Sequence, residues 1–174
     1  MPFYFAYGSN MLAARLRARC PSARVIGTAA VAGFDIAFDK IGQDGSGKAT
    51  LLTAAGQVVQ GALFQLDEAE LATLDQIEGV GRGYDRVEIS VNCSSGSIGA
   101  ATYLAPNAHR RSDIQPFDWY IGLVVAGAHE RGLPRDWIRR LADTPALADP
   151  DVRRPRLIEA QALLAACPPG WRLG

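Results

Sequence analysis

The sequence has few of the residues that build metal centres and disulfide frameworks. Only three of its 174 residues are cysteine and only two are histidine. Cys20, Cys93 and Cys167 lie far apart and form no Cys-x-x-Cys pair, so neither a disulfide framework nor a structural zinc site is expected. His109 and His129 are too few for a histidine-rich centre. We therefore expect no bound metal.

An excess of one charge and a long apolar run are also missing. Eighteen Lys and Arg residues balance eighteen Asp and Glu residues, so no global field attracts nucleic acid or an anionic membrane. No uncharged apolar run is long enough for a transmembrane helix. The first ten residues lack the basic region of a signal peptide and turn polar at Gly8. We expect a cytoplasmic protein with neither nucleic-acid nor membrane partners.

What is present is the composition of an ordinary globular domain, 48% hydrophobic and 21% charged. A chain of 174 residues can form one domain with a real core, and neither an internal repeat nor a domain boundary is visible in residues 1–174. About six short strands and several helices are expected. The predicted fold is a mixed α/β fold, a small mixed β-barrel or curled sheet with packing helices.

Hydrophobic alternation and turn residues predict the strands. Short runs at 3–6 and 34–38 are expected to be strands, and 49–54 and 58–66 are expected to form a hairpin with Gly56 at its turn. Two further strands are expected at 86–93 and 98–104. The polar, glycine-rich segment 42–48 is predicted to be a loop.

Capping and breaking residues predict the helices. Asn10 is expected to cap a helix that runs to about residue 19. Asp67 and Glu70 fit a capping box for a helix that ends at Gly79. The C-terminal part should contain an apolar helix over 117–131, an amphipathic helix around 137–141, a loop over 143–155 and a final helix over 157–166.

The first segment with chemical potential is Tyr7-Gly8-Ser9-Asn10, between the first strand and the first helix. Backbone N–H groups at a helix N-terminus can hold a carboxylate or a developing oxyanion. Gly8 lets the backbone approach a ligand closely, while Ser9 and Asn10 add side-chain donors. An ordinary strand-to-helix turn with an Asn cap is the alternative.

The second segment places Glu78 at the end of the helix that begins near Asp67. The helix macrodipole disfavours a negative charge there, and burial beside Ile77 and Val80 would act in the same direction. A carboxyl group that exchanges a proton near neutral pH suits general acid–base catalysis. A solvated glutamate at a helix end is the alternative.

Together the two segments resemble the γ-glutamylcyclotransferase family, which has an AIG2-like fold. The N-terminal motif of that family is similar to Tyr4-Phe5-Ala6-Tyr7-Gly8-Ser9-Asn10, and its Leu-Asp-x-x-Glu-Gly segment is matched by residues 74–79. Tyr120 and the Gly-Leu-Pro sequence at 132–134 extend the similarity. The resemblance covers roughly residues 3–137, and the tail 143–174 is not matched.

This resemblance implies a barrel-like α/β fold with an active-site cavity at one end. Glu78 would be the catalytic acid/base, and no metal or other cofactor is needed. The implied substrate-binding residues are Tyr4, Phe5, Ala6, Tyr7, Gly8, Ser9, Asn10, Tyr84 and Tyr120. The spacing from Glu78 to Tyr84 is one residue shorter than in the family pattern. Tyr103 is a further candidate for the cavity, and ordinary core packing is its favoured alternative.

The implied activity converts a γ-glutamyl-amino acid or a γ-glutamylamine to 5-oxoproline and a free amino acid or amine. The partner would be this small molecule, and the enzyme a monomer or homodimer. Alternatives are a biosynthetic enzyme that removes a γ-glutamyl group and a non-catalytic protein that binds γ-glutamyl ligands. A thiol enzyme using Cys20 or Cys93 is a further alternative, disfavoured because no histidine lies nearby in sequence.

Overall fold

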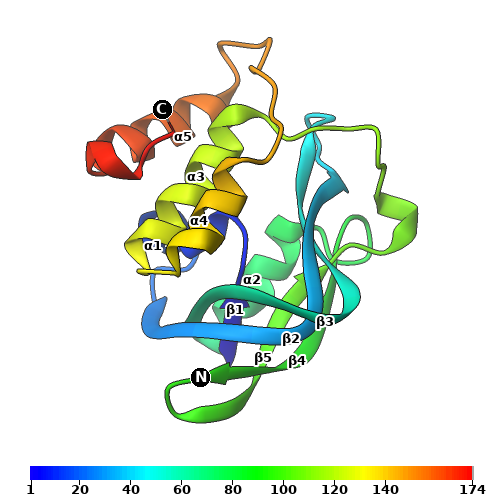
Figure 1. Cartoon of the computed structure of the whole chain (residues 1–174), viewed down its shortest axis with the longest axis vertical. Coiled ribbons are helices and arrows are strands. Elements are labelled where there is room, and N and C mark those ends of the chain that lie inside the picture. The colour runs from blue at the N-terminus through cyan, green and yellow to red at the C-terminus, as the bar shows by residue number, and fades with distance from the viewer. Residues whose placement is uncertain (174) are drawn as a thin grey trace.

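Five strands close into a barrel in the order β1-β3-β2-β4-β5 (Figure 1). The computed structural model describes residues 1–173. The strands are β1 (Phe3–Ala6), β2 (Arg24–Ile41), β3 (Gly47–Gln65), β4 (Asp85–Cys93) and β5 (Gly96–Leu104). The β1–β5 pair is parallel and the other neighbouring pairs are antiparallel. The predicted mixed α/β barrel is therefore confirmed.

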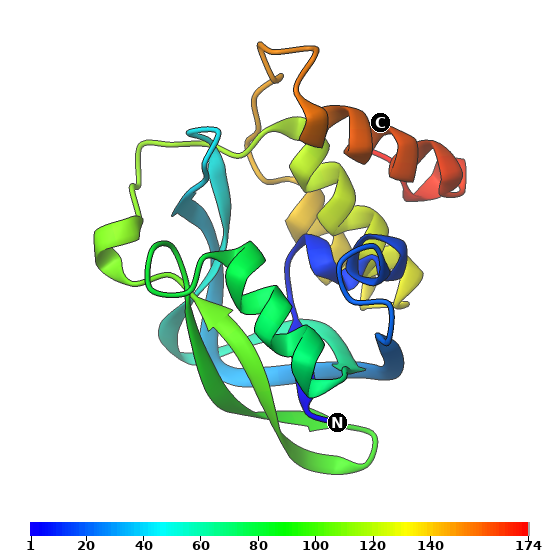
Figure 2. The same cartoon turned by 180° about the vertical axis from the view of Figure 1, so that it is seen from behind.

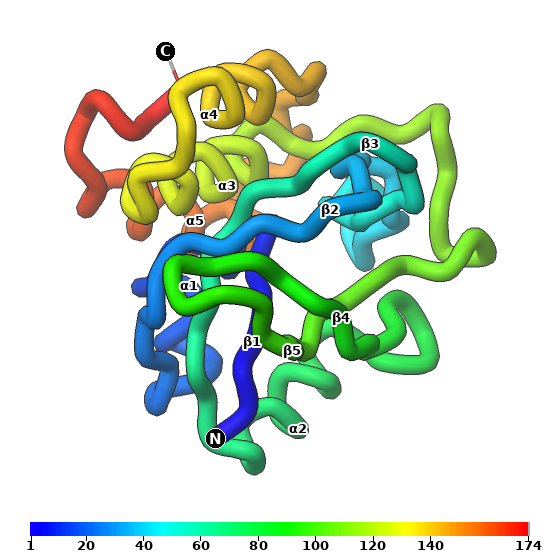
Figure 3. Tube along the Cα trace, turned by 60° about the horizontal axis from the view of Figure 1, so that its bottom comes forward, coloured from blue at the N-terminus to red at the C-terminus, as the bar shows by residue number. Residues whose placement is uncertain are grey.

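The hairpin predicted around Gly56 is wrong, because β3 continues through this residue. Gly56, with a φ of 80°, and Gly33, with a φ of 81°, both lie in the register shift between the pairs Ala32–Val58 and Phe34–Thr53 of β2 and β3. Such an irregularity bends a strand pair without ending it. The two long strands curve together along the barrel wall (Figure 3), and the chain reverses instead at residues 42–46.

Five α-helices complete the fold, and four of them gather on one side of the barrel. The helices are α1 (Ala13–Arg17), α2 (Glu68–Glu78), α3 (Asp118–Glu130), α4 (Arg135–Ala142) and α5 (Pro155–Ala166), with short 3₁₀ turns at Ser9–Met11, Asn107–His109 and Pro169–Trp171. Figures 1 and 2 show α4 and α5 beside α3, and α2 lies in front of the strands in Figure 2. Within residues 1–173 no helix combines the length and apolarity that crossing a membrane requires.

Helix α3 holds the turn that follows β1. Ten of its 13 residues are buried. A Cβ at Gly127 would lie 2.6 Å from the backbone N of Leu12, so only glycine allows this close approach. At the end of α3, the carboxylate of Glu130 accepts a hydrogen bond of 2.8 Å from the backbone N–H of Ala13. The start of α1 is thus capped by a residue 117 positions away.

Two predicted caps are wrong, because tertiary partners take the side chains. Asp67 is the N-cap of α2 but makes no side-chain cap hydrogen bond. Glu70 instead accepts a hydrogen bond of 3.0 Å from the backbone N–H of Ser22, and the Ser22 hydroxyl accepts one from the backbone N–H of Asp67. The side chain of Asn10 likewise caps no helix and points to other partners. The predicted end of α2 is confirmed, since Gly79 is its C-cap at a φ of 70°.

Candidate active site

All five tyrosines of the chain line a single pocket, which we call the inner pocket. It has a volume of about 340 Å³, including the part open to solvent. The lining residues are Tyr4, Tyr7, Gly8, Ser9, Asn10, Ala49, Glu78, Tyr84, Tyr103 and Tyr120. The predicted segments around Gly8 and Glu78 therefore meet in one place, although they are about 70 residues apart in sequence.

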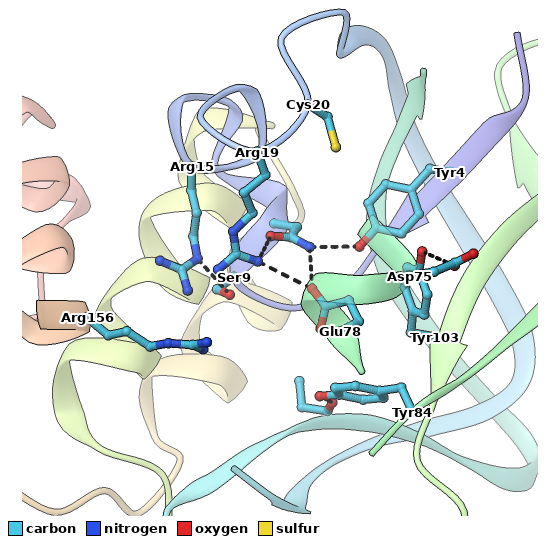
Figure 4. Close-up of polar contacts among 12 residues, drawn as sticks. Tyr4, Ser9, Arg15, Arg19, Cys20, Asp75, Glu78, Tyr84, Tyr103 and Arg156 are labelled. Carbon is cyan, nitrogen blue, oxygen red and sulfur yellow. Dashed lines mark hydrogen bonds and ion pairs between the residues drawn. The ribbon is translucent and has the colours of Figure 1, made fainter. Parts of the chain in front are cut away.

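Glu78 is held in the inner pocket by one of its two carboxylate oxygens. Its Oε1 accepts hydrogen bonds of 3.1 Å from Asn10 Nδ2 and 3.3 Å from Arg19 Nη1 (Figure 4). Arg19 Nη1 also donates to Asn10 Oδ1 at 3.1 Å. Within residues 1–173, Oε2 of Glu78 has no hydrogen-bond partner. The carboxylate is therefore oriented and still has an oxygen available for a proton.

Asn10 is the centre of this arrangement. Its Nδ2 donates to the hydroxyl of Tyr4 at 3.1 Å as well as to Glu78, and its Oδ1 accepts from Arg19. These contacts explain why it does not cap a helix. Arg19 was not predicted as a site residue. Its place nine residues after Asn10, beyond α1, carries no local sequence signal for this contact.

Val80 does not desolvate Glu78 as predicted, because its side chain faces outward. Val80 is 40% exposed, and Glu78 has a side-chain exposure of 18%. The charged neighbour of Glu78 is instead Arg19, whose Nη1 lies 3.3 Å from Oε1. The helix end alone therefore does not describe the environment of Glu78.

The remaining tyrosine hydroxyls bind the pocket walls. The Tyr84 hydroxyl donates a hydrogen bond of 2.7 Å to the backbone O of Ala49. The Tyr120 hydroxyl accepts one of 3.1 Å from the backbone N–H of Ala49. Tyr7 donates to the backbone O of Tyr103. Burial raises the pKa of Tyr4, Tyr7, Tyr84, Tyr103 and Tyr120 above the ordinary value for tyrosine. These hydroxyls therefore remain protonated near neutral pH and serve in hydrogen bonding.

Tyr103 both lines the pocket and packs in the core. Its hydroxyl donates a hydrogen bond of 2.8 Å to Asp75 Oδ1, and Asp75 Oδ2 forms an ion pair of 2.8 Å with Arg86. Asp75, which belongs to the Leu-Asp-x-x-Glu-Gly segment, is not a lining residue of the inner pocket. It connects α2 to β4 and β5 and so fixes the helix that presents Glu78.

Phe5 and Ala6, which the resemblance assigned to substrate binding, do not line the pocket. Both are buried in the core, with exposures of 0% and 1%. A Cβ at Gly61 would lie 2.7 Å from ring atoms of Phe5, so this ring packs closely on β3. The expectation that Phe5 and Ala6 bind substrate is corrected: their side chains pack in the core, while the adjacent Tyr4 and Tyr7 reach the pocket.

Ser9 connects the pocket to the C-terminal helix. Its Oγ accepts a hydrogen bond of 3.1 Å from Arg15 Nε, and Arg15 Nη1 lies 3.3 Å from Glu159 of α5. Arg15 is 2% exposed, and burial lowers its pKa to about 10. Within residues 1–173, the backbone N–H groups of Gly8 and Ser9 have no hydrogen-bond acceptor. They remain available to an anionic ligand group.

The geometry gives little support to metal or thiol chemistry. Within residues 1–173, no three His, Cys, Asp or Glu side chains group as metal ligands would. Cys20 is buried, its Sγ lies 3.6 Å from the backbone O of Glu70, and burial raises its pKa to about 11. A thiol with a raised pKa is a poor nucleophile near neutral pH.

Known proteins resemble this chain in sequence and in fold. The AIG2-like family matches residues 58–141. The chain is 32% identical to gamma-glutamylcyclotransferase of Bos taurus and 33% identical to that of Homo sapiens, in each case over 145 residues that cover 79% of this chain and 76% of the relative. A solved structure of a gamma-glutamyl cyclotransferase is 28% identical with a TM-score of 0.83, covering 92% of this chain and 98% of that one.

Proposed function

The chain belongs to the γ-glutamylcyclotransferase family, and on this premise we propose that it is itself a γ-glutamylcyclotransferase. It converts a γ-glutamyl-amino acid or γ-glutamylamine to 5-oxoproline and the free amino acid or amine. The supporting observation is the Glu78 carboxylate, which is fixed through Oε1 and has a free Oε2 in the inner pocket. No cofactor takes part, because the substrate carries its own nucleophile.

The reaction is an intramolecular acyl transfer. The α-amino nitrogen attacks the γ-carbonyl carbon, a new C–N bond closes the five-membered ring, and the original amide C–N bond breaks. Glu78 removes a proton from the α-amine and delivers it to the departing nitrogen. Holding the glutamyl chain curled makes the attack effectively unimolecular, which can contribute roughly 7–11 kcal/mol to lowering the barrier.

The turn at Gly8 and Ser9 supplies the complementary donors. Their free backbone N–H groups hold either the α-carboxylate of the substrate or the tetrahedral oxyanion. A Cβ at Gly8 would lie 3.2 Å from the Tyr120 hydroxyl and from Ala49 Cβ, so a side chain here would crowd the pocket. Tyr4, Tyr84 and Tyr120 shape the walls around the glutamyl group.

The wider setting is part of the proposal. The enzyme acts in the cytoplasm as one domain over residues 1–174, as a monomer or homodimer, on a small molecule and without nucleic-acid or membrane partners. The balance of eighteen basic and eighteen acidic residues supports this, because it creates no global field for such partners.

The experiment that tests this function measures 5-oxoproline and free amine released from γ-glutamyl-amino acids, γ-glutamylamines and glutathione. Turnover of any of these compounds supports the proposal. A protein that binds γ-glutamyl ligands tightly without forming 5-oxoproline would instead be a binding protein on the same fold.

A further inference from the structure

A second pocket adjoins the inner pocket and carries an excess of positive charge. This outer pocket has a volume of about 570 Å³, including the part open to solvent. It shares Ser9, Glu78, Tyr84 and Tyr120 with the inner pocket, so the two meet at Glu78. Its charged lining residues are Arg15, Arg19, Lys40, Lys48, Arg156 and Glu78, five cations and one carboxylate.

Three of the five cations already have carboxylate partners. The ion pairs are Arg15–Glu159 at 3.3 Å, Arg19–Glu78 at 3.3 Å and Lys48–Asp44 at 2.9 Å. Two of these partners, Asp44 and Glu159, are not among the lining residues of the pocket. The positive charge of these three residues is therefore compensated within the protein.

Of the five cations that line the outer pocket, Lys40 and Arg156 have no ion-pair partner in residues 1–173. Lys40 is only 9% exposed, and its ammonium lies 4.6 Å from the centroid of the Tyr84 ring. Within residues 1–173 this ammonium has no hydrogen-bond acceptor. Arg156 reaches only Gln43 Oε1, at 3.4 Å. Figure 4 shows Arg156 pointing from α5 toward the site.

Lys40 is mostly buried as a residue and its ammonium forms no ion pair, so an anion placed beside it would be bound favourably. Burial lowers the pKa of Lys40, and the charge of Arg156 acts in the same direction. The carboxylates of Glu78 and Asp44 oppose this effect from beyond ion-pair distance. Two anionic groups on one ligand in the outer pocket would compensate both cations.

We infer that Lys40 and Arg156 bind the two carboxylates of a dicarboxylic leaving amino acid, so that the preferred substrates are γ-glutamyl peptides with such a leaving residue. The inference rests on the proposed function, because it places the γ-carbonyl beside Glu78. With the glutamyl group in the inner pocket, the leaving residue extends into the outer pocket. A monocarboxylic leaving residue brings one anionic group there, and a dicarboxylic residue brings two.

The same charges select against amine leaving groups. A γ-glutamyl polyamine would carry a further cation toward Lys40 and Arg156. Like charges facing each other in a pocket cost binding energy and exclude such partners. Between the γ-glutamyl-amino acids and the γ-glutamylamines, the outer pocket therefore favours the amino acids.

The test compares two substrates that differ by one charge, γ-glutamyl-glutamate and γ-glutamyl-glutamine. Their leaving residues are nearly isosteric, so the ratio of their kcat/KM values measures the effect of the second carboxylate alone. We expect the ratio to favour the glutamate compound by at least about tenfold, the value of one hydrogen bond to a charged group. The preference should reside mainly in KM and weaken as salt is added.

Two substitutions probe the binding residues, and a third, which also removes one positive charge, serves as the control. Lys40→Met and Arg156→Gln should each move the ratio toward one, while Arg153→Gln, at an exposed position outside the pocket, should leave it unchanged. Arg156 is half-buried, so its variant keeps the test available if Lys40→Met does not fold.

The outcomes separate the two proposals. Turnover of both substrates at equal kcat/KM overturns the inference and leaves the proposed function standing. A preference that survives both substitutions also overturns it. Absence of turnover with both substrates, and with the wider set of γ-glutamyl compounds, contradicts the proposed function and removes the inference with it.

Discussion

Arg19 and Glu78, which both line the outer pocket, form an ion pair of 3.3 Å, and Asn10 hydrogen-bonds to both side chains. Arg19 follows α1, and Glu78 is the last residue of α2. The pair has side-chain exposures of 14% and 18%, so solvent screens it less than a surface pair. Glu78 is thereby fixed in direction by two residues of the N-terminal segment.

Arg19 is expected to position Glu78 for catalysis. Arg19→Met should lower kcat by roughly ten- to a hundredfold, because a misplaced catalytic group loses orientation, with a smaller change in KM. Arg19→Lys should recover part of the rate, since it keeps the charge and loses the second hydrogen bond. Steady-state kinetics of both variants measure this, beside Arg24→Gln at an exposed position as the control. A kcat unchanged in Arg19→Met would contradict the role.

Ser9 is expected to matter more for stability than for chemistry. In Ser9→Ala the backbone donor remains, so turnover should fall less than in Glu78→Gln. The buried Arg15 Nε loses its acceptor, which should cost about 1–3 kcal/mol of the free energy of unfolding. Urea unfolding and kinetics of Ser9→Ala, with the exposed Ser90→Ala as the control, measure both effects. A collapse of turnover equal to that of Glu78→Gln, with the fold intact, would assign the chemistry to the hydroxyl.

Two glycines of α3 should respond oppositely to alanine. A Cβ at Gly127 meets the backbone of Met11 and Leu12 at less than 3.0 Å, so Gly127→Ala should cost about 1–3 kcal/mol and displace the turn at Gly8. A Cβ at Gly122 meets only the flexible end of Leu164 at 3.1 Å, and the helix gains up to about 1 kcal/mol from alanine. Unfolding free energies of the two variants test this. Equal changes in unfolding free energy for the two variants would contradict the claim that the contact of Gly127 with Met11 and Leu12 requires glycine.

Asp149 should stabilise the fold in a pH-dependent way. Its hydrogen bonds with Arg154 lower its pKa to about 2, while an unfolded aspartate titrates near about 3.9. A depressed folded-state pKa gives stability that is complete above about pH 4 and lost as the pH falls through about 2. The wild type should therefore exceed Asp149→Asn in unfolding free energy at pH 7, with the difference shrinking between pH 4 and 2.

The exposed pair of Asp136 with Arg139 provides the control for Asp149. The side chain of Asp136 is 95% exposed, and Asp136→Asn should change stability little at any pH. A difference between wild type and Asp149→Asn that stays constant from pH 7 to pH 2 would contradict the account. Because Asp149 binds Trp119 of α3 and Arg154 beside α5, it also helps to place Arg156.

Sequence reasoning located what is encoded locally. Glu78 and Gly79 could be placed at a helix end because capping residues act on their neighbours in the chain. Gly56 was misplaced because the same backbone freedom serves a turn and a bend in a long strand. Asn10 was misread as a cap because its actual partners are distant in sequence.

The missing part of the site consists of long-range charge contacts. Arg19, Lys40 and Arg156 come from three separate regions, and only the closed barrel with its packed helices brings them together. The tail 143–174, which the family resemblance does not cover, supplies Arg156 to the outer pocket. It also supplies Glu159, the ion-pair partner of Arg15. No periodicity or capping pattern reports such contacts.

The central claim is tested most directly by the release of 5-oxoproline from γ-glutamyl-amino acids by wild type and Glu78→Gln. Glutamine is nearly isosteric with glutamate and can keep a hydrogen bond with Arg19 through its oxygen, so the fold should remain intact. We predict turnover by the wild type and its loss in the variant, with substrate binding retained. Turnover near the wild-type rate in a folded Glu78→Gln protein would contradict the assignment of Glu78 as the acid/base.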